Sequence, residues 1–392
     1  MAIDNKDKKI LNVPHLRFPE FSGEWEMVSL QDIATINPKS DPLQNTFIYI
    51  DLEAVEKGEL RKIQEIMREE APSRAQRVID NNDILFQCVR PYQKNNYIHR
   101  ILNTSNQQWV ASTGYAQIRT TELPNYIYHL LNTDEFNRKV MVRCTGSSYP
   151  AINSEDLATI HLYYTPDKKE QLKISRLLDL LDKRIATQNK IIEDLKKLKS
   201  AIVDKLYSST NGKTYSFCQL FEVVNEKNKK LAYKNVLSAS QELGMIERSN
   251  INIDIKFEQE SISGYKIVRK GDYVVHLRSF QGGFAFSDTT GICSPAYTIL
   301  RPNDLVVYGY LSHFFTSKPF IKSLKLVTYG IRDGRSINVD EWLDMPILLP
   351  SAQEQMRILT IVNAIDAKLH NEAKVQFCLS SQKSYLLNTM FI

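Results

Sequence analysis

Hydrophobic residues recur at alternating spacings of four and three in two long stretches of the chain, 166–208 and 350–392. This spacing is the a/d pattern of a coiled-coil helix, because it keeps the hydrophobic positions on one face. The first seam, with one polar position, is formed by Ile174, Leu178, Leu181, Ile185, Gln188, Ile192 and Leu195, and after a one-residue shift by Leu198, Ile202 and Leu206. The second is formed by Ile358, Val362, Ile365, Leu369, Leu379, Leu386 and Met390. Both stretches therefore predict long helices.

The ends of the predicted helices carry recognisable signals. Each stretch begins at a proline and contains no other proline and no glycine. Asp167 is the predicted N-cap of the first helix, with Glu170 three residues later, and Asn211-Gly212 marks its end. At about 1.5 Å per residue, about 41 helical residues give a rod of about 60 Å.

The second helical stretch repeats the first at a constant offset of 184 residues. Asp182 falls on Asp366, Lys199 falls on Lys383, and no gap is needed over about 40 residues. The segments before the two helices also match, although the offset drifts. The matching pairs are Trp25–Ile33 with Tyr215–Val223, Val78–Leu85 with Ile267–Val274, Ser112–Arg119 with Ser294–Arg301, and Ala151–Asn153 with Ser336–Asn338.

Each half therefore predicts one α+β globule of about 140 residues followed by one helix. Short apolar runs separated by turn signals predict strands, and an aromatic-rich helical stretch follows them at 126–141 and again at 308–324. We expect a fold of two similar α+β domains separated by two long antiparallel coiled-coil helices, related by an approximate two-fold axis. The predicted segments are a lead at 1–24, domains at 25–165 and 209–349, and helices at 166–208 and 350–392.

Composition narrows the function classes. The formal charge is only +5, so a nucleic-acid partner is permitted but not required. No apolar run has the length of a membrane span, and the first residues lack the apolar core of a signal peptide. The five cysteines are scattered, which indicates reduced thiols and favours a cytoplasmic location: Cys88, Cys144, Cys218, Cys293 and Cys378.

The sequence lacks the common catalytic motifs. Gly212-Lys213-Thr214 has no upstream glycine of a phosphate-binding loop, and Asn37-Pro38-Lys39-Ser40 departs from the Asn-Pro-Pro-aromatic motif of amino-methyltransferases at its last two positions. The seven histidines show no metal-ligand spacing. We therefore expect no catalytic residue, no metal site and no cofactor bound by this chain.

Two pairs of polar loops are candidates for binding DNA. They lie at equivalent places in the two halves but differ in content, as readers of different half-sites would. Arginine suits a bidentate contact to guanine, asparagine and glutamine suit adenine, and lysine, serine, threonine and tyrosine suit phosphate. The candidates are Arg90, Tyr92, Gln93, Lys94, Asn95, Asn96, Arg143, Ser147, Ser148 and Tyr149 in the first half, and Arg278, Ser279, Gln281, Tyr329, Arg332 and Arg335 in the second.

The chain resembles the specificity subunits of type I restriction–modification systems. The resemblance rests on the opening Pro14–Phe21 with Gly23–Glu26, on the helix openings Pro-x3-Glu-Gln-x-(Lys/Arg)-Ile at Pro166 and Pro350, and on Ser294-Pro-Ala-Tyr297. It covers essentially the whole chain. Ser112-Thr-Gly-Tyr115 departs from the Ser-Pro-Ala-Tyr form in the first half.

The resemblance implies a non-catalytic subunit in which each domain reads one half of a bipartite double-stranded DNA target and the helices set the spacing. It also implies two adenine-N6 methyltransferase subunits as partners, with S-adenosylmethionine on them, and a restriction subunit that uses ATP and Mg²⁺. The candidate partner-binding residues are Leu16, Arg17, Phe18, Glu170, Gln171, Glu354 and Gln355.

Several alternatives stay open at this point. Residues 16–21 could form an edge strand instead of a docking segment, and the helices could pair without any partner. The polar seam positions Gln188, Glu372 and Gln376 could set the register between the two helices, or they could form a hydrated surface for a partner. The whole chain could also be a stand-alone DNA-binding protein. A methyltransferase fused to its specificity module is disfavoured by the missing motifs.

Overall fold

The computed structural model describes residues 12–100, 107–240, 243–250, 259–276, 283–329 and 336–392. The chain divides into two compact units. Unit 1 comprises Met1–Asn189 and Lys374–Ile392, and unit 2 comprises Lys190–Ala373. Within the described ranges, no helix combines the length and the apolar character needed to cross a membrane.

The strands of unit 1 are β1 (Glu26–Ser29), β2 (Ala34–Ile36), β3 (Thr46–Ile50), β4 (Val55–Glu56), β5 (Glu59–Leu60), β6 (Gln64–Met67), β7 (Ala75–Ile79), β8 (Ile84–Gln87), β9 (Tyr97–Ile98), β10 (Gln108–Ser112), β11 (Tyr115–Thr120) and β12 (His161–Tyr164). The helices that lie wholly in unit 1 are α1 (Leu30–Ile33), α2 (Pro124–Leu131), α3 (Asp134–Arg143) and α4 (Ser154–Ala158). Two long helices, α5 (Lys168–Ser208) and α9 (Ala352–Thr389), each contribute residues to both units.

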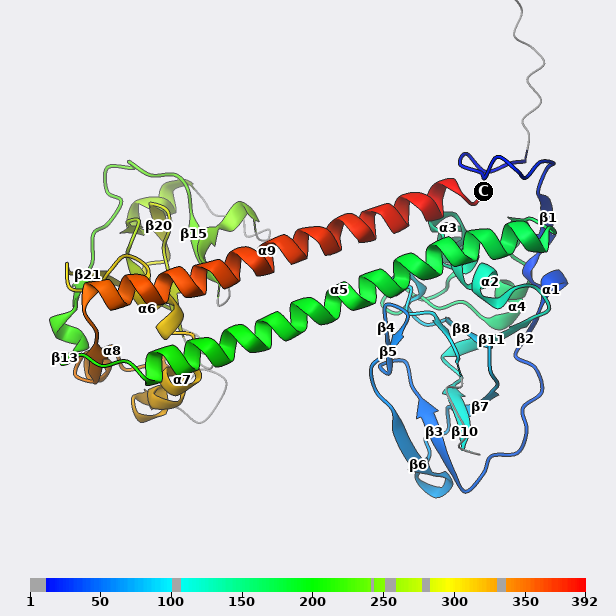
Figure 1. Ribbon diagram of the computed structural model, residues 1–392, viewed down its shortest axis with the longest axis horizontal. Coiled ribbons are helices and arrows are strands. Elements are labelled where there is room, and N and C mark those ends of the chain that lie inside the picture. Colours follow the sequence, from blue (N-terminus) through cyan, green and yellow to red (C-terminus); the bar gives the residue numbers. More distant parts are fainter. Residues whose placement is uncertain (1–11, 101–106, 241–242, 251–258, 277–282, 330–335) are drawn as a thin grey trace, which may run out of the picture. The chain divides into compact units, whose positions relative to one another are not determined.

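Two four-stranded sheets form the globule of unit 1 (Figure 1). One has the strand order β6-β3-β10-β7, in which β10 runs parallel to β3, and the other is the antiparallel sheet β2-β11-β8-β9. Short turns lead from β7 into β8 and from β10 into β11, so the same chain segments pass from one sheet to the other. A two-stranded pair, β1 with β12, precedes the start of α5.

The strands of unit 2 are β13 (Lys213–Ser216), β14 (Phe221–Val224), β15 (Leu237–Ser240), β16 (Gly244–Glu247), β17 (Lys266–Val268), β18 (Tyr273–Val275), β19 (Phe284–Phe286), β20 (Gly291–Cys293), β21 (Thr298–Pro302), β22 (Thr328–Tyr329), β23 (Ser336–Ile337) and β24 (Pro346–Leu349). Its own helices are α6 (Tyr310–Phe314), α7 (Lys318–Ser323) and α8 (Val339–Leu343). The sheet order β14-β21-β18-β19 repeats the order β2-β11-β8-β9, and β13 pairs with β24 as β1 pairs with β12.

Equivalent side chains make the same contacts in the two units, which confirms the predicted repeat. Asp83 receives two hydrogen bonds from Arg119, at 2.8 Å each, and Asp272 receives two from Arg301, at 2.9 Å each. Both carboxylates are almost fully buried, and each also accepts a backbone N–H three residues earlier in the chain. The shared pair fastens the turn before β8 or β18 to the neighbouring strand.

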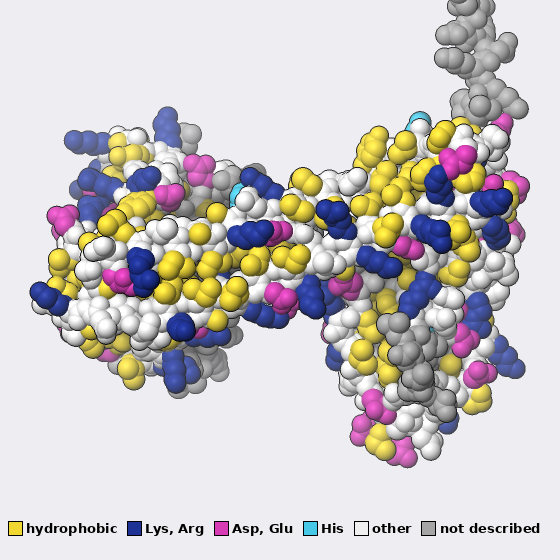
Figure 2. All heavy atoms as spheres, in the orientation of Figure 1, with side chains coloured by type: hydrophobic (Ala, Val, Ile, Leu, Met, Phe, Trp, Pro, Cys, Tyr) yellow, Lys and Arg dark blue, Asp and Glu magenta, His cyan; other side chains and the backbone are white. Residues whose placement is uncertain are grey.

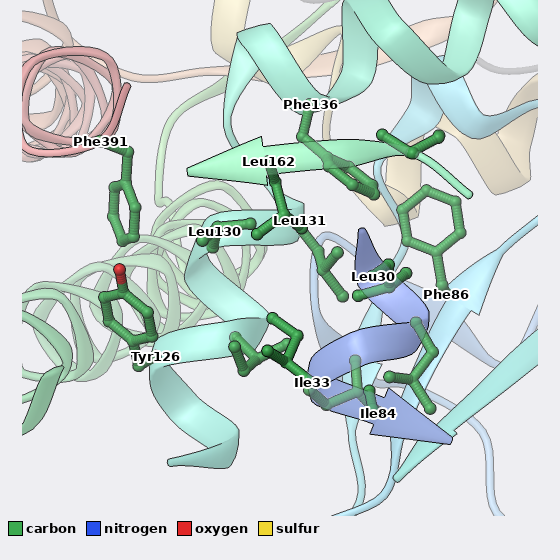
Figure 3. Close-up of a cluster of buried hydrophobic side chains, with 14 of the residues drawn as sticks. Leu30, Ile33, Ile84, Phe86, Tyr126, Leu130, Leu131, Phe136, Leu162 and Phe391 are labelled. Atoms are coloured by element: carbon green, nitrogen blue, oxygen red, sulfur yellow. The ribbon is translucent and has the colours of Figure 1, made fainter. Parts of the chain in front are cut away.

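The start of α5 and the end of α9 pack on the same core in unit 1. Asp167 caps α5 as predicted, since its carboxylate accepts the backbone N–H of Lys169 at 2.8 Å. Leu178 of α5 is fully buried in this core, together with Phe391 beyond the end of α9. Figure 3 shows Phe391 directed toward Tyr126, and the two ring centres are 5.4 Å apart.

In both units the two long helices run antiparallel, as predicted. In unit 1, Asp182 forms an ion pair with Lys383, which lies ahead of the C-terminal end of α9. In unit 2, Lys199 forms an ion pair with Asp366. These four residues are the two pairs that the 184-residue offset relates, so one interaction occurs twice, once in each unit.

The structure differs from the sequence prediction in two places. The single helical stretch expected at 126–141 is two helices, because the hydroxyl of Thr133 caps the start of α3. Ser317 divides the equivalent stretch in the same way. Leu198 was expected to continue the seam but is 52% exposed, and Val203 is buried in its place. The predicted domain limits stay predictions, whereas the contacts divide the chain within the helices.

Candidate nucleic-acid interface

The structure brings together the two candidate loops of the first half. Residues 88–96 join β8 to β9, and residues 144–153 join α3 to α4. Val89 and Ala151 form a β-bridge, and the backbone N–H of Arg90 donates to the carbonyl of Pro150 at 2.8 Å. Two loops whose contacting residues are about 60 positions apart in the sequence therefore form one surface of unit 1.

The backbone of the first loop has an uncommon conformation. Arg90 and Lys94 have φ angles of 55° and 51°, in the left-handed region, on either side of the one-turn helix Pro91–Gln93. Non-glycine residues rarely take this conformation, which carries strain and is concentrated at functional sites. The turn leaves Tyr92 51% exposed.

The guanidinium of Arg90 lies over the ring of Tyr149, with 4.3 Å between its central carbon and the ring centre. Tyr149 is 61% exposed, and Ser147 and Ser148 beside it are also exposed. Stacking on the ring orients the planar guanidinium without neutralising its charge. Arg90 is thus a positioned cation at the junction of the two loops.

A hollow of about 560 Å³ opens next to this junction. Three arginines line it, Arg61, Arg74 and Arg90, against two glutamates. Gln93, Asn95 and Tyr149 add polar groups to the lining. On the face shown in Figure 2, the Lys and Arg side chains of unit 1 are interspersed with acidic and hydrophobic ones. The lining of the hollow itself holds one more basic residue than acidic residues.

Three of the candidate DNA-binding residues have hydrogen-bond or ion-pair partners within unit 1. Asn96 is 2% exposed, and its amide oxygen accepts the backbone N–H of Gln87 at 2.8 Å. Lys94 forms an ion pair with Asp134 at 2.6 Å. Arg143 donates to the carbonyl of Asp156 and to the hydroxyl of Thr159, each at 2.7 Å. Intramolecular partners thus engage the polar groups of Asn96, Lys94 and Arg143, and their assignment to DNA binding stays a prediction.

Other candidates in this loop stay at the surface although they also bond internally. Gln93 is exposed, and its side-chain oxygen accepts a hydrogen bond from Gln87 at 3.1 Å. The side-chain oxygen of Asn95 accepts the backbone N–H of Lys57 at 2.9 Å. These bonds fix the carbonyl ends of the two amides.

The candidates of the second half fall outside the described part of the chain. This applies to Arg278, Ser279, Gln281, Arg332 and Arg335, and to the side chain of Tyr329. In chain order, residues 277–282 lie between β18 and β19, as residues 88–96 lie between β8 and β9. The two stretches thus join equivalent strands of the repeat.

Sequence reasoning missed two arginines of the hollow. Arg61 follows β5 and Arg74 precedes β7, so each is an isolated basic residue in a loop. Arg61 forms an ion pair with Glu59 at 2.8 Å, and Arg74 is exposed. Only the sheet topology places these residues beside Arg90, and no local pattern could have identified them.

The candidate partner-binding residues at the start of α5 are tied to the lead segment of unit 1. Arg17 donates to both carboxylate oxygens of Glu170, at 2.7 and 2.8 Å, and this ion pair raises the pKa of Arg17. Glu170 is fully buried, Phe18 is partly buried against the core, and Leu16 is 40% exposed. Residues 15–21 form bends and a turn, so the edge-strand alternative is wrong.

The glutamines at the start of the two long helices, Gln171 and Gln355, form hydrogen bonds within the chain. The side-chain oxygen of Gln171 accepts the backbone N–H of Leu123 at 3.2 Å, and that of Gln355 accepts the N–H of Val307 at 2.8 Å. Both side chains are almost completely buried. The side chains of Glu170, Gln171 and Gln355 thus serve contacts within the chain, and their part in binding a partner stays a prediction. Glu354 is 35% exposed.

The described residues contain no group of three or more histidine, cysteine, aspartate or glutamate side chains that could hold a metal ion. The cationic and hydrogen-bonding groups of unit 1 that the fold gathers at one place are those of the hollow beside Arg90 and Tyr149.

The sequence and the structure were both compared with known proteins, and the matches agree with one another. Residues 22–197 match the type I restriction modification DNA specificity domain. The type I restriction enzyme HindI specificity subunit of Haemophilus influenzae is 23% identical over 186 residues. That match covers 46% of this chain and 37% of the curated relative, so it spans less than half of either protein.

Solved structures extend the likeness of fold to nearly the whole chain. One is a structure of a type I restriction–modification system, with a TM-score of 0.61 at 19% identity over 93% of this chain and 97% of that one. Another is the S subunit of such a system from M. genitalium, with a TM-score of 0.55 at 14% identity over 97% and 99%. The predicted resemblance to the specificity subunits of type I restriction–modification systems is thus confirmed, by the family match over residues 22–197 and by the likeness of fold over nearly the whole chain.

Proposed function

We propose that this chain is the non-catalytic DNA-recognition subunit of a type I restriction–modification complex, in which each unit reads one half of a bipartite target. The observation that carries the proposal is the junction of two loops in unit 1, where Arg90 is stacked on Tyr149 beside a hollow lined by three arginines. A positioned guanidinium suits bidentate contact with guanine, and the neighbouring Arg74, which is exposed, suits phosphate.

The remaining parts of the proposal concern the partners. Two adenine-N6 methyltransferase subunits would dock on this chain and carry S-adenosylmethionine, and restriction subunits would supply ATP- and Mg²⁺-dependent cleavage. Extraction of the target base from the duplex would then take place in a methyltransferase subunit. The absence of catalytic motifs from the sequence supports this division of labour.

The experiment is to map methylated adenines in DNA from cells that carry the chain, cells that lack it, and cells that carry Arg90→Ala. We expect Arg90→Ala to relax base preference in only one half of the target. Loss of one bidentate contact corresponds to about 1–3 kcal/mol, or roughly 5- to 150-fold in discrimination. Arg138→Ala is the matched control, because Arg138 is 64% exposed on α3 and pairs with Glu135.

Two outcomes would count against the proposal. Equal loss of preference in both halves of the target would contradict independent reading, and the same test applies to Arg278→Ala or Arg332→Ala. Purification of the chain from cells without any accompanying methyltransferase would favour a stand-alone DNA-binding protein.

A further inference from the structure

The two long helices begin with the same four-residue pattern but in different surroundings. The patterns are Glu170-Gln-Leu-Lys173 in α5 and Glu354-Gln-Met-Arg357 in α9. The glutamines bond internally in both units, as described above. The glutamate and the basic residue face different environments, and this contrast carries the inference.

In unit 1 the lead segment, residues 12–24, covers the start of α5. Arg17 holds both oxygens of Glu170, whose third partner is the hydroxyl of Thr165 at 2.7 Å. Lys173 lies over the ring of Phe18, 4.4 Å from its centre, and also pairs with Glu20. An arginine, an aromatic ring and a carboxylate from one short segment thus satisfy both charged residues of the helix.

The lead segment is also fixed at its other side within unit 1. The backbone N–H of Leu16 donates to the carbonyl of Thr389 at 2.8 Å, and the guanidinium of Arg17 donates to the carbonyls of Ser22 and Gly23. These bonds hold the segment in one conformation. Its groups are therefore already engaged in unit 1.

Among the described residues of unit 2, the chain that corresponds in sequence to the lead segment is much shorter. Only residues 209–212 join α5 to β13, whereas the whole lead segment precedes β1. Glu354 accepts two hydrogen bonds from Arg357 on its own turn, at 2.8 and 2.7 Å. The side chains of Glu354 and Arg357 are 35% and 63% exposed, and Met356 between them is 54% exposed.

We propose that the start of α9 is a docking site for an extended segment of a protein partner that carries an arginine, an aromatic residue and a carboxylate. The arginine would bind Glu354 as Arg17 binds Glu170, and the ring and the carboxylate would bind Arg357. Charge complementarity supports this occupant, because Glu354 and Arg357 correspond to Glu170 and Lys173, and the lead segment supplies partners for both of these residues in unit 1. The proposal rests on the proposed function only in taking a methyltransferase subunit as the partner.

Exchange of partners at this site is physically reasonable. An exposed ion pair between residues three apart on one helix contributes little to stability, so Glu354 and Arg357 can separate at low cost. A guanidinium stacks on an aromatic ring at least as well as the ammonium of Lys173 does. Burial of Met356 under the segment would add apolar contact.

The test uses a labelled synthetic peptide with the sequence of residues 12–24, titrated with the full-length chain and followed by fluorescence anisotropy. We expect saturable binding that weakens at least tenfold with Glu354→Gln in the chain or with Arg17→Ala in the peptide. Circular dichroism checks that the Glu354→Gln chain stays folded. We expect it to fold because the side chain of Glu354 is partly exposed.

The matched control is Glu170→Gln in the chain. If the peptide instead displaces the lead segment in unit 1, Glu170→Gln will change its binding and Glu354→Gln will not, and the proposal is wrong. Absence of saturable binding to the wild-type chain would also overturn it. Neither result bears on half-site reading, which the methylation maps test separately.

Discussion

At the scale of single residues, the buried carboxylates of Asp83 and Asp272 organise the two globules. Each lies at the end of a turn and accepts hydrogen bonds both from an arginine on the adjacent strand and from a backbone N–H. A buried charge is tolerated only when it is paired and hydrogen-bonded, and removal of one partner leaves an uncompensated group. Each pair is thus a point where one substitution acts on a whole sheet.

We expect Asp83→Asn to lower the free energy of unfolding by about 3 kcal/mol, because Arg119 loses its buried counter-charge. Asp80→Asn is the matched control, since Asp80 pairs with the same arginine but is 65% exposed, and it should cost less than about 1 kcal/mol. Urea unfolding followed by circular dichroism measures both variants. Equal losses would show that burial of Asp83 is not what matters.

Burial also separates the cysteines by reactivity. It raises the pKa of the Cys88 and Cys293 thiols to about 12, whereas Cys218 and Cys378 are exposed. The thiolate is the reactive form, so a raised pKa slows alkylation near neutral pH. We expect iodoacetamide to modify Cys218 and Cys378 in the folded protein, and Cys88 and Cys293 only after unfolding. Mass spectrometry of the digested protein measures this order, and early modification of Cys88 would contradict it.

The candidate site could be predicted from the sequence only in part, for a reason visible at single residues. Polarity located the loops at 88–96 and 144–153, but it could not separate Arg90, which is stacked on Tyr149, from Asn96, which is buried. That distinction depends on which backbone groups the fold leaves in need of a partner. Arg61 and Arg74 reach the hollow through sheet pairing, which one sequence does not reveal.

At the scale of elements, periodicity and capping located the long helices well. The strongest signals were the seam of α5 and its cap at Asp167. The prediction was wrong at Leu198, because the a/d pattern of the coiled coil does not continue to that residue. In this part of α5 the helix packs on the globule of unit 2, and Val203 is the residue that faces it. Tertiary packing therefore selects the buried face near the helix ends.

The seam of α5 in unit 1 can be tested with two neighbouring leucines. Leu178 is fully buried in the core and Leu180 is 65% exposed. We expect Leu178→Ala to cost about 3 kcal/mol, the range for a buried leucine that leaves a cavity. Leu180→Ala should stay within about 0.5 kcal/mol. Thermal unfolding of the two variants measures the difference, and similar melting temperatures would contradict the burial pattern.

At the scale of the whole molecule, the chain uses one plan twice. The offset of 184 residues relates the pair Asp182 and Lys383 in unit 1 to the pair Asp366 and Lys199 in unit 2. A change that preserves the register must therefore be made in both helices together. Matched deletions in both helices can therefore be used to change the helix length in an experiment.

We expect removal of residues 186–192 together with residues 370–376 to shorten the spacer of the methylated target. Seven residues are two helical turns and about 10 Å, which corresponds to about three base pairs. The heptad seam and both ion pairs keep their register in this double deletion. Methylation mapping measures the spacer. An unchanged spacer length would contradict the proposal that the helices set the distance between the two half-sites. Either deletion alone breaks the register between the helices and should abolish methylation of the target.

The core of unit 1 has a consequence for the order in which the protein is made. Phe391 packs against Trp25 and Tyr126, and Leu387 and Met390 belong to the same core cluster. Trp25 and Tyr126 leave the ribosome more than 250 residues before these three residues. Unit 2 is continuous in the chain, so all of its core residues emerge before these three. During synthesis, the core of unit 1 therefore stays incomplete and its hydrophobic surface stays exposed, while unit 2 can already fold. A nascent chain that stops short of residue 387 would display this surface to chaperones and proteases.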